Sequence, residues 1–467
     1  MKKPDEHNVF DWLKITEWFL WLLFAAGAGQ LIWFAYNNPD RLNGIQLLPY
    51  PMVKVSICCL AIALIYIFFL ALAAILYRPF KDDRKEEELP GVTVIVPAYN
   101  EGKHVSDTLS SILASDYPAE KLEIIAVNDG SQDDTWEWIT YSANRANGRI
   151  RTINLPRNGG KKHALYTGIK AATFDFIVTV DSDSLVERRA VRNIIAPFQD
   201  ERVGAVAGNI RGKKDARNFF VLMMDVAMTY SCEFMRPLQS AFGTVFCTPG
   251  ALSAYRKSAV MPLLDEWMHQ TFMGVPSTIG EDRAIATLLL RSGYYNVHQQ
   301  NAVVETCLPD TYWKLCRMLI RWMRSDVREN ILMSRFLLRN LISKKFRGVM
   351  MLFHWLILSG GMILPVLYLP GLVVLIIFAL DQMIFLPLPL ISSTAWSLVP
   401  AVIYGRIRKP RKMVWAFIFG VFAQIGLIWI YLYAFCTVRN SKWMTREKRK
   451  ERQRPAVGAL LKKAPRR

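Results

Sequence analysis

Acidic side chains follow three apolar segments of the chain, at the points where each segment ends. Asp181 and Asp183 follow FIVTV, Asp129 follows LEIIAVN, and Glu101 follows VTVIVPAY with Asn100 between them. A carboxylate pair such as Asp181 and Asp183 is able to hold a hard divalent cation, which usually keeps water ligands and bridges the phosphates of a substrate. These residue types therefore indicate chemistry on a phosphate-bearing ligand.

The carboxylate pair also has a structural interpretation, which the residues alone leave open: it can cap the helix that the pattern predicts from residue 187. The chain contains no GxGxxG or GxxxxGK[ST] motif, which argues against a dinucleotide dehydrogenase and a P-loop ATPase. The six His include no pair at i and i+4, and the seven Cys include no CxxC pair. The sequence therefore predicts neither a zinc site nor a disulfide framework, and it fits a reducing compartment best.

Short β-rich segments alternate with helical patterns through the middle of the chain. The predicted strands are 92–100, 122–131, 149–156, 176–184 and 203–211, and the predicted helices are 103–115, 133–146, 161–172 and 187–198. Alternation of this kind is typical of an α/β domain with a mostly parallel sheet and helices on both faces. Ligands of such sheets bind at the carboxyl ends of the strands, so we expect the acidic groups to meet in one cleft.

The 467 residues carry a net charge of +19, and 52% of them are hydrophobic, which excludes a disordered chain. Apolar residues concentrate at the two ends. Segments 16–36 and 53–77 are each long enough to cross a hydrocarbon core of roughly 30 Å. A secretory signal peptide is the alternative for the first segment, but no convincing cleavage site precedes the point where the apolar stretch resumes. We therefore predict an integral membrane protein that holds one large soluble domain.

The C-terminal apolar segments are 348–370, 371–404 and 413–438, and the basic loop 405–412 lies between the last two. The tail from Arg439 carries twelve Lys or Arg against two Glu, so +10 of the net charge lies there. Basic flanks stay cytoplasmic, yet 413–438 is long enough to cross only once between two basic flanks. Either 371–404 is a bent pair of short spans, or 413–438 enters and returns along the inner interface. Anionic lipid, rather than nucleic acid, is the expected partner of the tail.

Apolar and basic residues alternate at helical spacing over 311–346, which favours an amphipathic helix on the inner leaflet. A charged surface helix of the soluble domain is the alternative. The predicted parts are two N-terminal transmembrane helices in 1–78, a cytoplasmic domain in 79–310, amphipathic interfacial helices in 311–347, C-terminal transmembrane or interfacial helices in 348–438, and a basic cytoplasmic segment and tail in 439–467.

An ordered set of motifs resembles the processive family 2 glycosyltransferases, in particular the hyaluronan synthases and the nodulation chitooligosaccharide synthases. The motifs are VPAYNE (96–101), NDGS (128–131), NGGKKHAL (158–165), VDSDS (180–184), GED (280–282) and RW (321–322). Three longer segments support the resemblance: 242–256 is similar to the switch and acceptor region, 280–294 to the catalytic helix, and 437–448 to the gating segment. The likeness extends from about residue 80 to 448, and its specificity lies in the order of the motifs.

The resemblance implies a GT-A type, nucleotide-sugar-binding domain inserted between N- and C-terminal transmembrane helices, with Mg²⁺ or Mn²⁺ as cofactor. It implies the following roles: Tyr99 and Glu101 shape the uracil pocket, Asp129 contacts uridine, Lys161 meets the phosphates, Asp181 and Asp183 hold the metal, Asp282 is the general base, Arg321 and Arg446 bind the diphosphate, Trp322 stacks on the acceptor sugar, and Trp443 closes the gate. Plain N-capping remains the alternative for Asp282, and interfacial anchoring remains the alternative for Arg321 and Trp322.

Two positions depart from the family pattern: Met318 replaces the Gln of QxxRW, and Met444 replaces the Gly of WGTR. These replacements put processivity and the identity of the donor in doubt, whereas the transfer chemistry depends on neither residue.

The expected function is that of a multi-pass enzyme of the cell membrane. It would polymerise a β-linked polysaccharide from UDP-N-acetylglucosamine, with or without UDP-glucuronate, and guide the polymer out through its own spans. UDP-glucose is a less favoured donor. The alternatives are a non-processive transferase that glycosylates a lipid, and a transporter or receptor with an inactive nucleotide-sugar domain.

Overall fold

The computed structural model describes residues 77–213, 218–341, 346–379, 401, 404–405 and 413–441. The predicted N-terminal spans, apart from Tyr77, and the tail residues Met444, Trp443 and Arg446 lie outside these ranges. The described residues fall into two compact units. One contains 77–364 and 430–441, and the other contains the described residues between 365 and 429.

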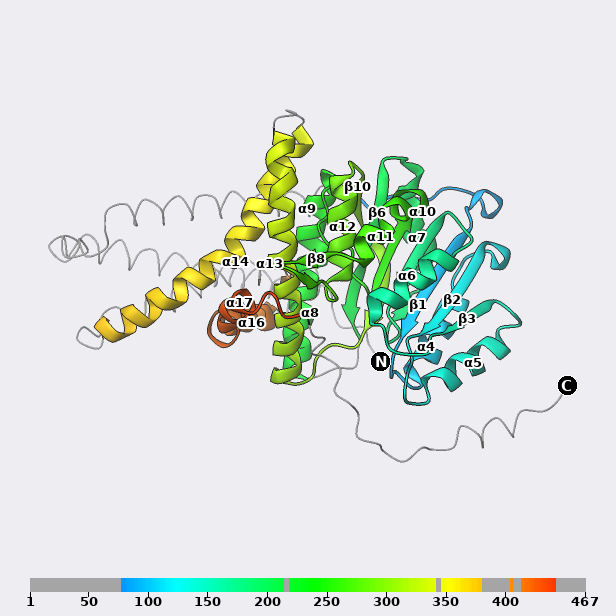
Figure 1. The fold of residues 1–467 in the computed structure, drawn as a ribbon, viewed down its shortest axis with the longest axis horizontal. Helices are drawn as coiled ribbons and strands as arrows, with labels where there is room; N and C mark the ends of the chain where they lie inside the picture. The colour runs from blue at the N-terminus through cyan, green and yellow to red at the C-terminus, as the bar shows by residue number, and fades with distance from the viewer. Residues whose placement is uncertain are drawn as a thin grey trace, which may run out of the picture. The chain divides into compact units, whose positions relative to one another are not determined.

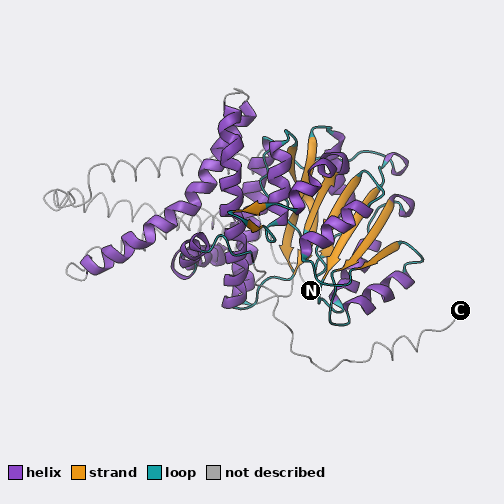
Figure 2. Cartoon of the chain, in the orientation of Figure 1, coloured by secondary structure: helices purple, strands orange, loops and turns teal. Residues whose placement is uncertain are grey.

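A central sheet organises the larger unit, with helices on both of its faces (Figures 1 and 2). Among the described residues this sheet has eight strands in the order β3-β2-β1-β4-β7-β6-β10-β5. The strands are β1 (Val92–Ala98), β2 (Leu122–Asn128), β3 (Ile150–Asn154), β4 (Phe176–Val180), β5 (Leu185–Val186), β6 (Val203–Gly212), β7 (Leu252–Arg256) and β10 (Tyr295–Thr306). A separate hairpin pairs β8 (Thr271–Phe272) with β9 (Val275–Pro276).

The mostly parallel sheet that the sequence predicts is confirmed. Strands β3, β2, β1 and β4 pair in parallel, and so do β6 and β10. Strand β7 lies between β4 and β6 and is antiparallel to both, and β5 is antiparallel to β10. The five strands predicted from the sequence correspond to β1, β2, β3, β4 and β6, while β5, β7 and β10 were not predicted.

The α-helices that lie before residue 342 in the larger unit are α4 (His104–Leu113), α5 (Thr135–Arg145), α6 (Lys161–Ala171), α7 (Ala190–Ile195), α8 (Phe219–Tyr230), α9 (Arg236–Ala241), α10 (Lys257–Val260), α11 (Leu264–Met268), α12 (Glu281–Arg291) and α13 (Tyr312–Leu341). A π-helical turn, Ser231–Met235, joins α8 to α9. The predicted helix 187–198 is shorter than expected, since α7 gives way to a 3₁₀ turn that contains Pro197. Proline lacks the N–H that an α-helix needs at an interior position.

The core lies between the sheet and helices α6, α11 and α12 (Figure 1). Ile95 of β1 and Ile125 of β2 are fully buried there, together with Trp267 of α11. All seven residues of β1 are buried, as expected for a parallel strand covered on both faces. This packing fixes the carboxyl ends of β1, β2 and β4 relative to the first turns of α6 and α12.

Helix α13 occupies most of the segment for which the sequence predicts an amphipathic interfacial helix. It is 30 residues long and packs against α12. Its buried residues include Leu315, Ile320, Met333 and Leu337. The aromatic side chain of Trp313 is exposed. The helix therefore contributes a buried face to the larger unit, and its placement at a membrane interface stays a prediction.

Helix α14 (Phe346–Ala379) starts in the larger unit and continues into the smaller one, which also contains α16 (Met413–Gly426). Helix α17 (Trp429–Cys436) leads back to the larger unit. Within the described ranges, no helix combines the length and the apolar character needed to cross a membrane.

Candidate active site

The carboxyl ends of β1, β2 and β4 share one edge of the sheet because these strands are parallel. The loops after β1 and β2 are hydrogen-bonded to each other. Asn100 donates its backbone N–H to Ser131 Oγ over 3.0 Å, and its Oδ1 accepts the N–H of Gln132 over 2.9 Å. Asn100 has a φ of 54°, an uncommon backbone angle for a residue other than glycine. Tyr99 and Glu101 flank it and are half-buried at this edge.

Asp129 anchors the glycine turn that precedes α6. Its Oδ1 accepts the N–H of Gly159 and its Oδ2 accepts the N–H of Gly160, each over 2.9 Å, and the side chain is buried. Gly130, with a φ of 65°, packs so closely on the backbone of Arg157 that a Cβ would lie 2.8 Å from its Cα. The predicted uridine contact of Asp129 stays a prediction. What the geometry adds is that Asp129 fixes the start of the GGKK segment.

Lys161, the first residue of α6, joins two of the acidic groups. Its Nζ forms an ion pair with Oδ1 of Asp181, which lies at the end of β4. It forms a second ion pair, over 3.2 Å, with Oε1 of Glu281, which lies at the start of α12. Burial lowers the pKa of Lys161, but the neighbouring carboxylates outweigh burial and hold the pKa above its ordinary value. The contact also needs Gly250, because a Cβ there would collide with Lys161 Nζ and lie 3.3 Å from both Asp181 oxygens. Lys161 thus carries a permanent positive charge at the strand edge.

Asp183 lies two residues beyond Asp181, and its Oδ1 accepts hydrogen bonds from the hydroxyls of Ser184 over 3.3 Å and of Thr306 over 3.4 Å. Within the described ranges, no group of three or more His, Cys, Asp or Glu side chains is arranged to hold a metal ion. The two carboxylates nevertheless fit Mg²⁺ or Mn²⁺, since such ions are commonly bound through one or two carboxylates plus waters and substrate phosphates. Their oxygen donors are the hard ligands that these ions prefer.

Asp282 is the second residue of α12, after Gly280, which is the N-cap residue with a φ of 77°. Its Oδ1 accepts the N–H of Arg283 over 2.8 Å, its carbonyl accepts the hydroxyl of Thr248 over 3.1 Å, and Cys247 Sγ lies 3.8 Å from its Oδ2. Gly280 occupies the N-cap position and has no side chain to cap the helix, whereas the Asp282 carboxylate itself accepts a backbone N–H of the first turn. The capping alternative for Asp282 therefore stays open beside the predicted role of general base.

The carboxyl of Asp282 is poised to exchange a proton near neutral pH. Burial raises its pKa, the negative charge of Glu281 raises it further, and Lys161 and Arg321 lower it, with a net pKa of about 6. A base in this range is ionised at neutral pH and retains affinity for a proton. The contribution of Arg321 brings this α13 residue into the electrostatic environment of the site. The neighbouring Trp322 is 37% exposed.

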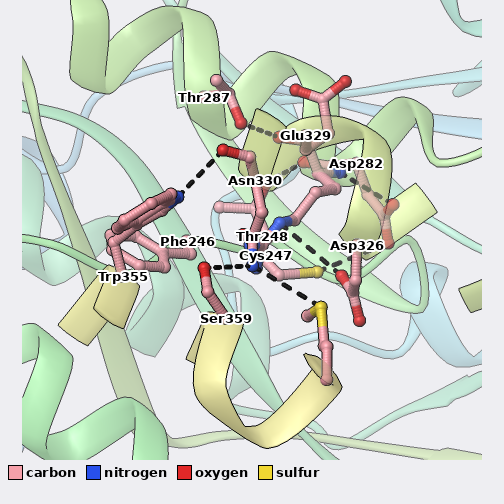
Figure 3. A network of polar contacts seen from close by, with 12 residues as sticks. Phe246, Cys247, Thr248, Asp282, Thr287, Asp326, Glu329, Asn330, Trp355 and Ser359 are labelled. Atoms are coloured by element: carbon pink, nitrogen blue, oxygen red, sulfur yellow. Dashed lines mark hydrogen bonds and ion pairs between the residues drawn. The ribbon is translucent and has the colours of Figure 1, made fainter. Parts of the chain in front are cut away.

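Sequence patterns did not reveal the polar network behind Asp282 (Figure 3). Arg283 is almost fully buried in α12, where it forms an ion pair with Asp326 over 3.6 Å and donates to Asn330 Oδ1 over 2.6 Å, both on α13. Its guanidinium also lies 5.4 Å from the ring centroid of Phe246. The sequence signal for this network is the charged residue Arg283 next to the apolar run of α12, because a buried charge needs a partner.

Known proteins with similar sequences are glycosyltransferases. Residues 93–264 match the family model described as glycosyl transferase family 2. An N-acetylglucosaminyltransferase of Mesorhizobium japonicum is 31% identical over 78% of this chain and 84% of its own length. One of Azorhizobium caulinodans is 29% identical over 77% of this chain and 88% of its own length. A hyaluronan synthase of Streptococcus pyogenes is 28% identical over 87% of this chain and 91% of its own length.

A mannosyltransferase from Pyrobaculum calidifontis, solved in complex with GDP-Man and Mn²⁺, has the same fold, with a TM-score of 0.55 and 22% sequence identity. The likeness covers 80% of this chain and 97% of that one. Fold and site together define a nucleotide-sugar-dependent hexosyltransferase of the GT-A type. The chain belongs to glycosyltransferase family 2, and the predicted membership among its processive enzymes is confirmed.

Proposed function

We propose that the protein is an inverting, metal-dependent polysaccharide synthase of the cell membrane, which adds sugars from a UDP-sugar to a growing β-linked chain and guides that chain across the membrane. The observation that carries this proposal is the arrangement of the acidic groups. Asp181 and Glu281 share Lys161, and Asp282 stands next to them with a pKa of about 6. The proposal assigns the role of metal-binding carboxylate to Asp181 at the end of β4, that of phosphate-binding cation to Lys161 of α6, and that of general base to Asp282 of α12.

In the transfer step, the acceptor hydroxyl oxygen attacks the anomeric carbon of the donor while the bond from that carbon to the phosphate oxygen breaks. The electron pair of the broken bond leaves with UDP, and the hydroxyl proton passes to the carboxylate of Asp282. Attack opposite the leaving group converts an α-linked donor into a β-linked product. Lys161 and Arg321 would stabilise the charge that develops on the diphosphate.

Asp181 and Asp183 are the residues that would hold Mg²⁺ or Mn²⁺. When bound, the ion supplies positive charge next to the departing UDP. Lys161 would then turn from Asp181 toward the donor phosphates. Tyr99, Glu101 and Asp129 border the same strand edge, and we assign the uridine part of the donor to them.

Processive synthesis requires that the product stay bound after each addition. We assign the acceptor sugar to Trp322, whose ring is partly exposed on α13 four residues after Met318. Aromatic rings suit sugar faces because they offer apolar area with a fixed orientation. The apolar segments on both sides of the domain, 16–36 and 53–77 before it and 348–438 after it, would form the membrane part, with the domain and the tail in the cytoplasm.

UDP-N-acetylglucosamine, alone or alternating with UDP-glucuronate, is the donor that we propose. The names of the rhizobial and streptococcal relatives support this choice. A lipid-directed, non-processive transferase is the second candidate, which the aromatic acceptor position and the tail segment argue against. An inactive nucleotide-sugar domain in a transporter or receptor is disfavoured because every acidic motif residue is present.

Membranes that contain the full chain provide the test. They are incubated with Mg²⁺ or Mn²⁺ and with labelled UDP-N-acetylglucosamine, UDP-glucuronate and UDP-glucose, singly and in pairs, and any polymer is digested with linkage-specific hydrolases. We expect high-molecular-weight product with UDP-N-acetylglucosamine, alone or together with UDP-glucuronate. Label that appears only in a lipid extract would favour the second candidate, and the absence of UDP release with every donor would contradict both.

A further inference from the structure

The loop Ser277–Gly280, which leads into Glu281 and Asp282, is held by two buried cations from different helices. Lys162 of α6 donates from Nζ to the Ser277 carbonyl over 3.0 Å, and Arg328 of α13 donates from Nη1 to Ser277 Oγ over 2.5 Å. Ser277 also donates its own N–H to the carbonyl of Gln270 over 2.9 Å. Every polar group of this serine therefore has a partner in the fold.

Lys162 holds the loop from the same helix turn that carries Lys161. Both its ammonium and Ser277 are buried, and the ammonium lies 5.4 Å from the ring centroid of Trp267. Burial and Arg328 lower the pKa of Lys162 to about 8, against the raising effect of Glu329 and Glu281, so the ammonium stays protonated at neutral pH. Consecutive lysines thus fix both ends of one short segment, since Lys161 pairs with Glu281 while Lys162 binds Ser277.

Arg328 extends the arrangement to a third segment. Its Nη2 donates to the Val438 carbonyl over 3.0 Å and to Ser441 Oγ over 3.1 Å, and its Nη1 lies 3.4 Å from the Ile279 carbonyl. The hydroxyl of Thr278 donates to the Ser441 carbonyl over 2.7 Å. One guanidinium therefore joins the loop before the candidate base to the described residues that precede the tail.

We infer that Lys162 and Arg328 are positioning residues that clamp Ser277 and so hold the first turn of α12, with Asp282, in place while Lys161 engages the donor. This inference rests on the proposed function. When Lys161 turns toward the donor phosphates, it gives up its ion pairs with Asp181 and Glu281. The bond from Lys162 to Ser277 then still joins α6 to the loop, and Arg328 joins the loop to α13.

The clamp predicts a specific kinetic signature. Lys162→Met should lower kcat at least about tenfold, because a base must lie within hydrogen-bonding reach of the acceptor proton. The dissociation constant for UDP should change less than about threefold, because Lys161 is untouched. Lys162→Arg, which keeps a charged donor, should recover most of the lost rate. Lys170→Met, which changes an exposed lysine of the same helix, is the matched control and should behave as wild type.

Hydrogen exchange of the full-length protein tests the clamp independently of activity. In Lys162→Met, the amides of 277–282 should exchange at least about tenfold faster, while those of 437–441 stay unchanged. In Arg328→Lys, which keeps the charge but loses the two-pronged geometry, both segments should exchange faster. Arg335→Lys, at an exposed arginine of α13, is the matched control and should change neither segment.

Unchanged exchange at 277–282 in both clamp variants would overturn the inference. So would a parallel loss of UDP binding and of protection across the whole domain, because it would assign Lys162 to general stability. These outcomes are distinct from a failure of the proposed function, which would appear as the absence of polymer in wild type under every donor.

Discussion

Arg283 Nη2 donates a 2.6 Å hydrogen bond to Oδ1 of Asn330, and this bond ties the helix that starts at the candidate base to α13. Asn330 in turn reaches α14: its Nδ2 donates to Ser359 Oγ over 3.3 Å, and its carbonyl accepts from Trp355 Nε1 over 2.9 Å (Figure 3). Three helices therefore meet at one buried amide. Arg283 also donates its backbone N–H to the carboxylate of Asp282. The side chain of Asn330 therefore holds Arg283, and Arg283 in turn holds the candidate base Asp282.

Replacement of Asn330 should be costly for this reason. Asn330→Ala removes the acceptor of a buried guanidinium donor, and we expect a loss of about 1–3 kcal/mol in the free energy of unfolding. Asn330→Asp keeps an acceptor for Arg283 and should lose less, and Ser359→Ala, which removes only one of the two partners of Nδ2, should lose least. Thermal unfolding of the detergent-solubilised variants measures the order. Equal stability of Asn330→Ala and wild type would contradict the role of the bond.

Asp282→Asn tests the base. If the carboxylate only takes the acceptor proton, the variant should bind UDP nearly as well as wild type and lose at least about 10²-fold in polymer synthesis. Residual synthesis together with weak UDP binding would instead indicate a structural role.

The raised pKa adds a pH dependence to this test. The base works in its ionised form, so kcat/KM of the wild type should fall as the pH drops below about 6. Because the folded-state pKa lies above the unfolded value, the ionised carboxylate weakens the fold at higher pH. Asp282→Asn should therefore unfold at a temperature no lower than wild type at pH 7. A pH profile without a limb near 6 would argue against Asp282 as the base.

Removal of one metal ligand should separate binding of the ion from folding. The Oδ1 of Asp183 accepts hydrogen bonds from the hydroxyls of Ser184 and Thr306, and an amide oxygen can accept the same bonds, so we expect Asp183→Asn to fold. We expect it to abolish turnover and the metal-dependent part of donor binding. Titration of UDP binding with and without Mn²⁺ measures the effect, and treatment of wild type with a chelator should reproduce it. Unchanged Mg²⁺ or Mn²⁺ dependence would remove Asp183 from the site.

A strand of the sheet was predictable from the sequence where its own residues are apolar enough to show that it is buried. Strands β1, β2 and β4 are runs of β-branched apolar residues that end in polar groups, a pattern visible without any partner. Strand β10 was missed because it buries polar residues, among them Asn296 and His298, which no hydrophobic pattern marks. The Nδ2 of Asn296 donates to the carbonyls of Val245 and Ala286, and these contacts exist only in the folded chain.

The site divides in the same way. Asp181 and Asp183 were recognisable because they follow an apolar segment, and Asp282 was recognised through the resemblance of its GED motif to the family pattern. The contacts that hold the loop before Asp282 were not recognisable. Lys162 and Ser277, for example, are 115 positions apart in the sequence and meet only in the folded chain. Gly280 illustrates the point, because a Cβ there would collide with Ser325 of α13, a contact that the GED motif does not reveal.

The tail segment offers the last test, because Arg328 and Thr278 bind Ser441, the residue just before it, to the loop that leads to Asp282. Trp443 and Arg446 follow two and five positions later in the sequence. An aromatic ring and a guanidinium suit closure over a nucleotide, and closure that excludes water strengthens the charge contacts of a site. Truncation after Ser441 should therefore leave a folded protein that binds donor weakly and makes little polymer. Arg446→Ala should raise the KM for donor.

Met444 provides a control within the same segment. Glycine tolerates backbone angles that other residues avoid, so Met444→Gly should keep or increase the rate of synthesis if the segment moves during each cycle. Synthesis by the truncated and full-length proteins is compared in membranes at equal protein levels, with donor binding measured in parallel. Full polymer synthesis by the truncated protein would show that the tail only binds lipid, because a segment that closes over the donor cannot be removed without loss of rate.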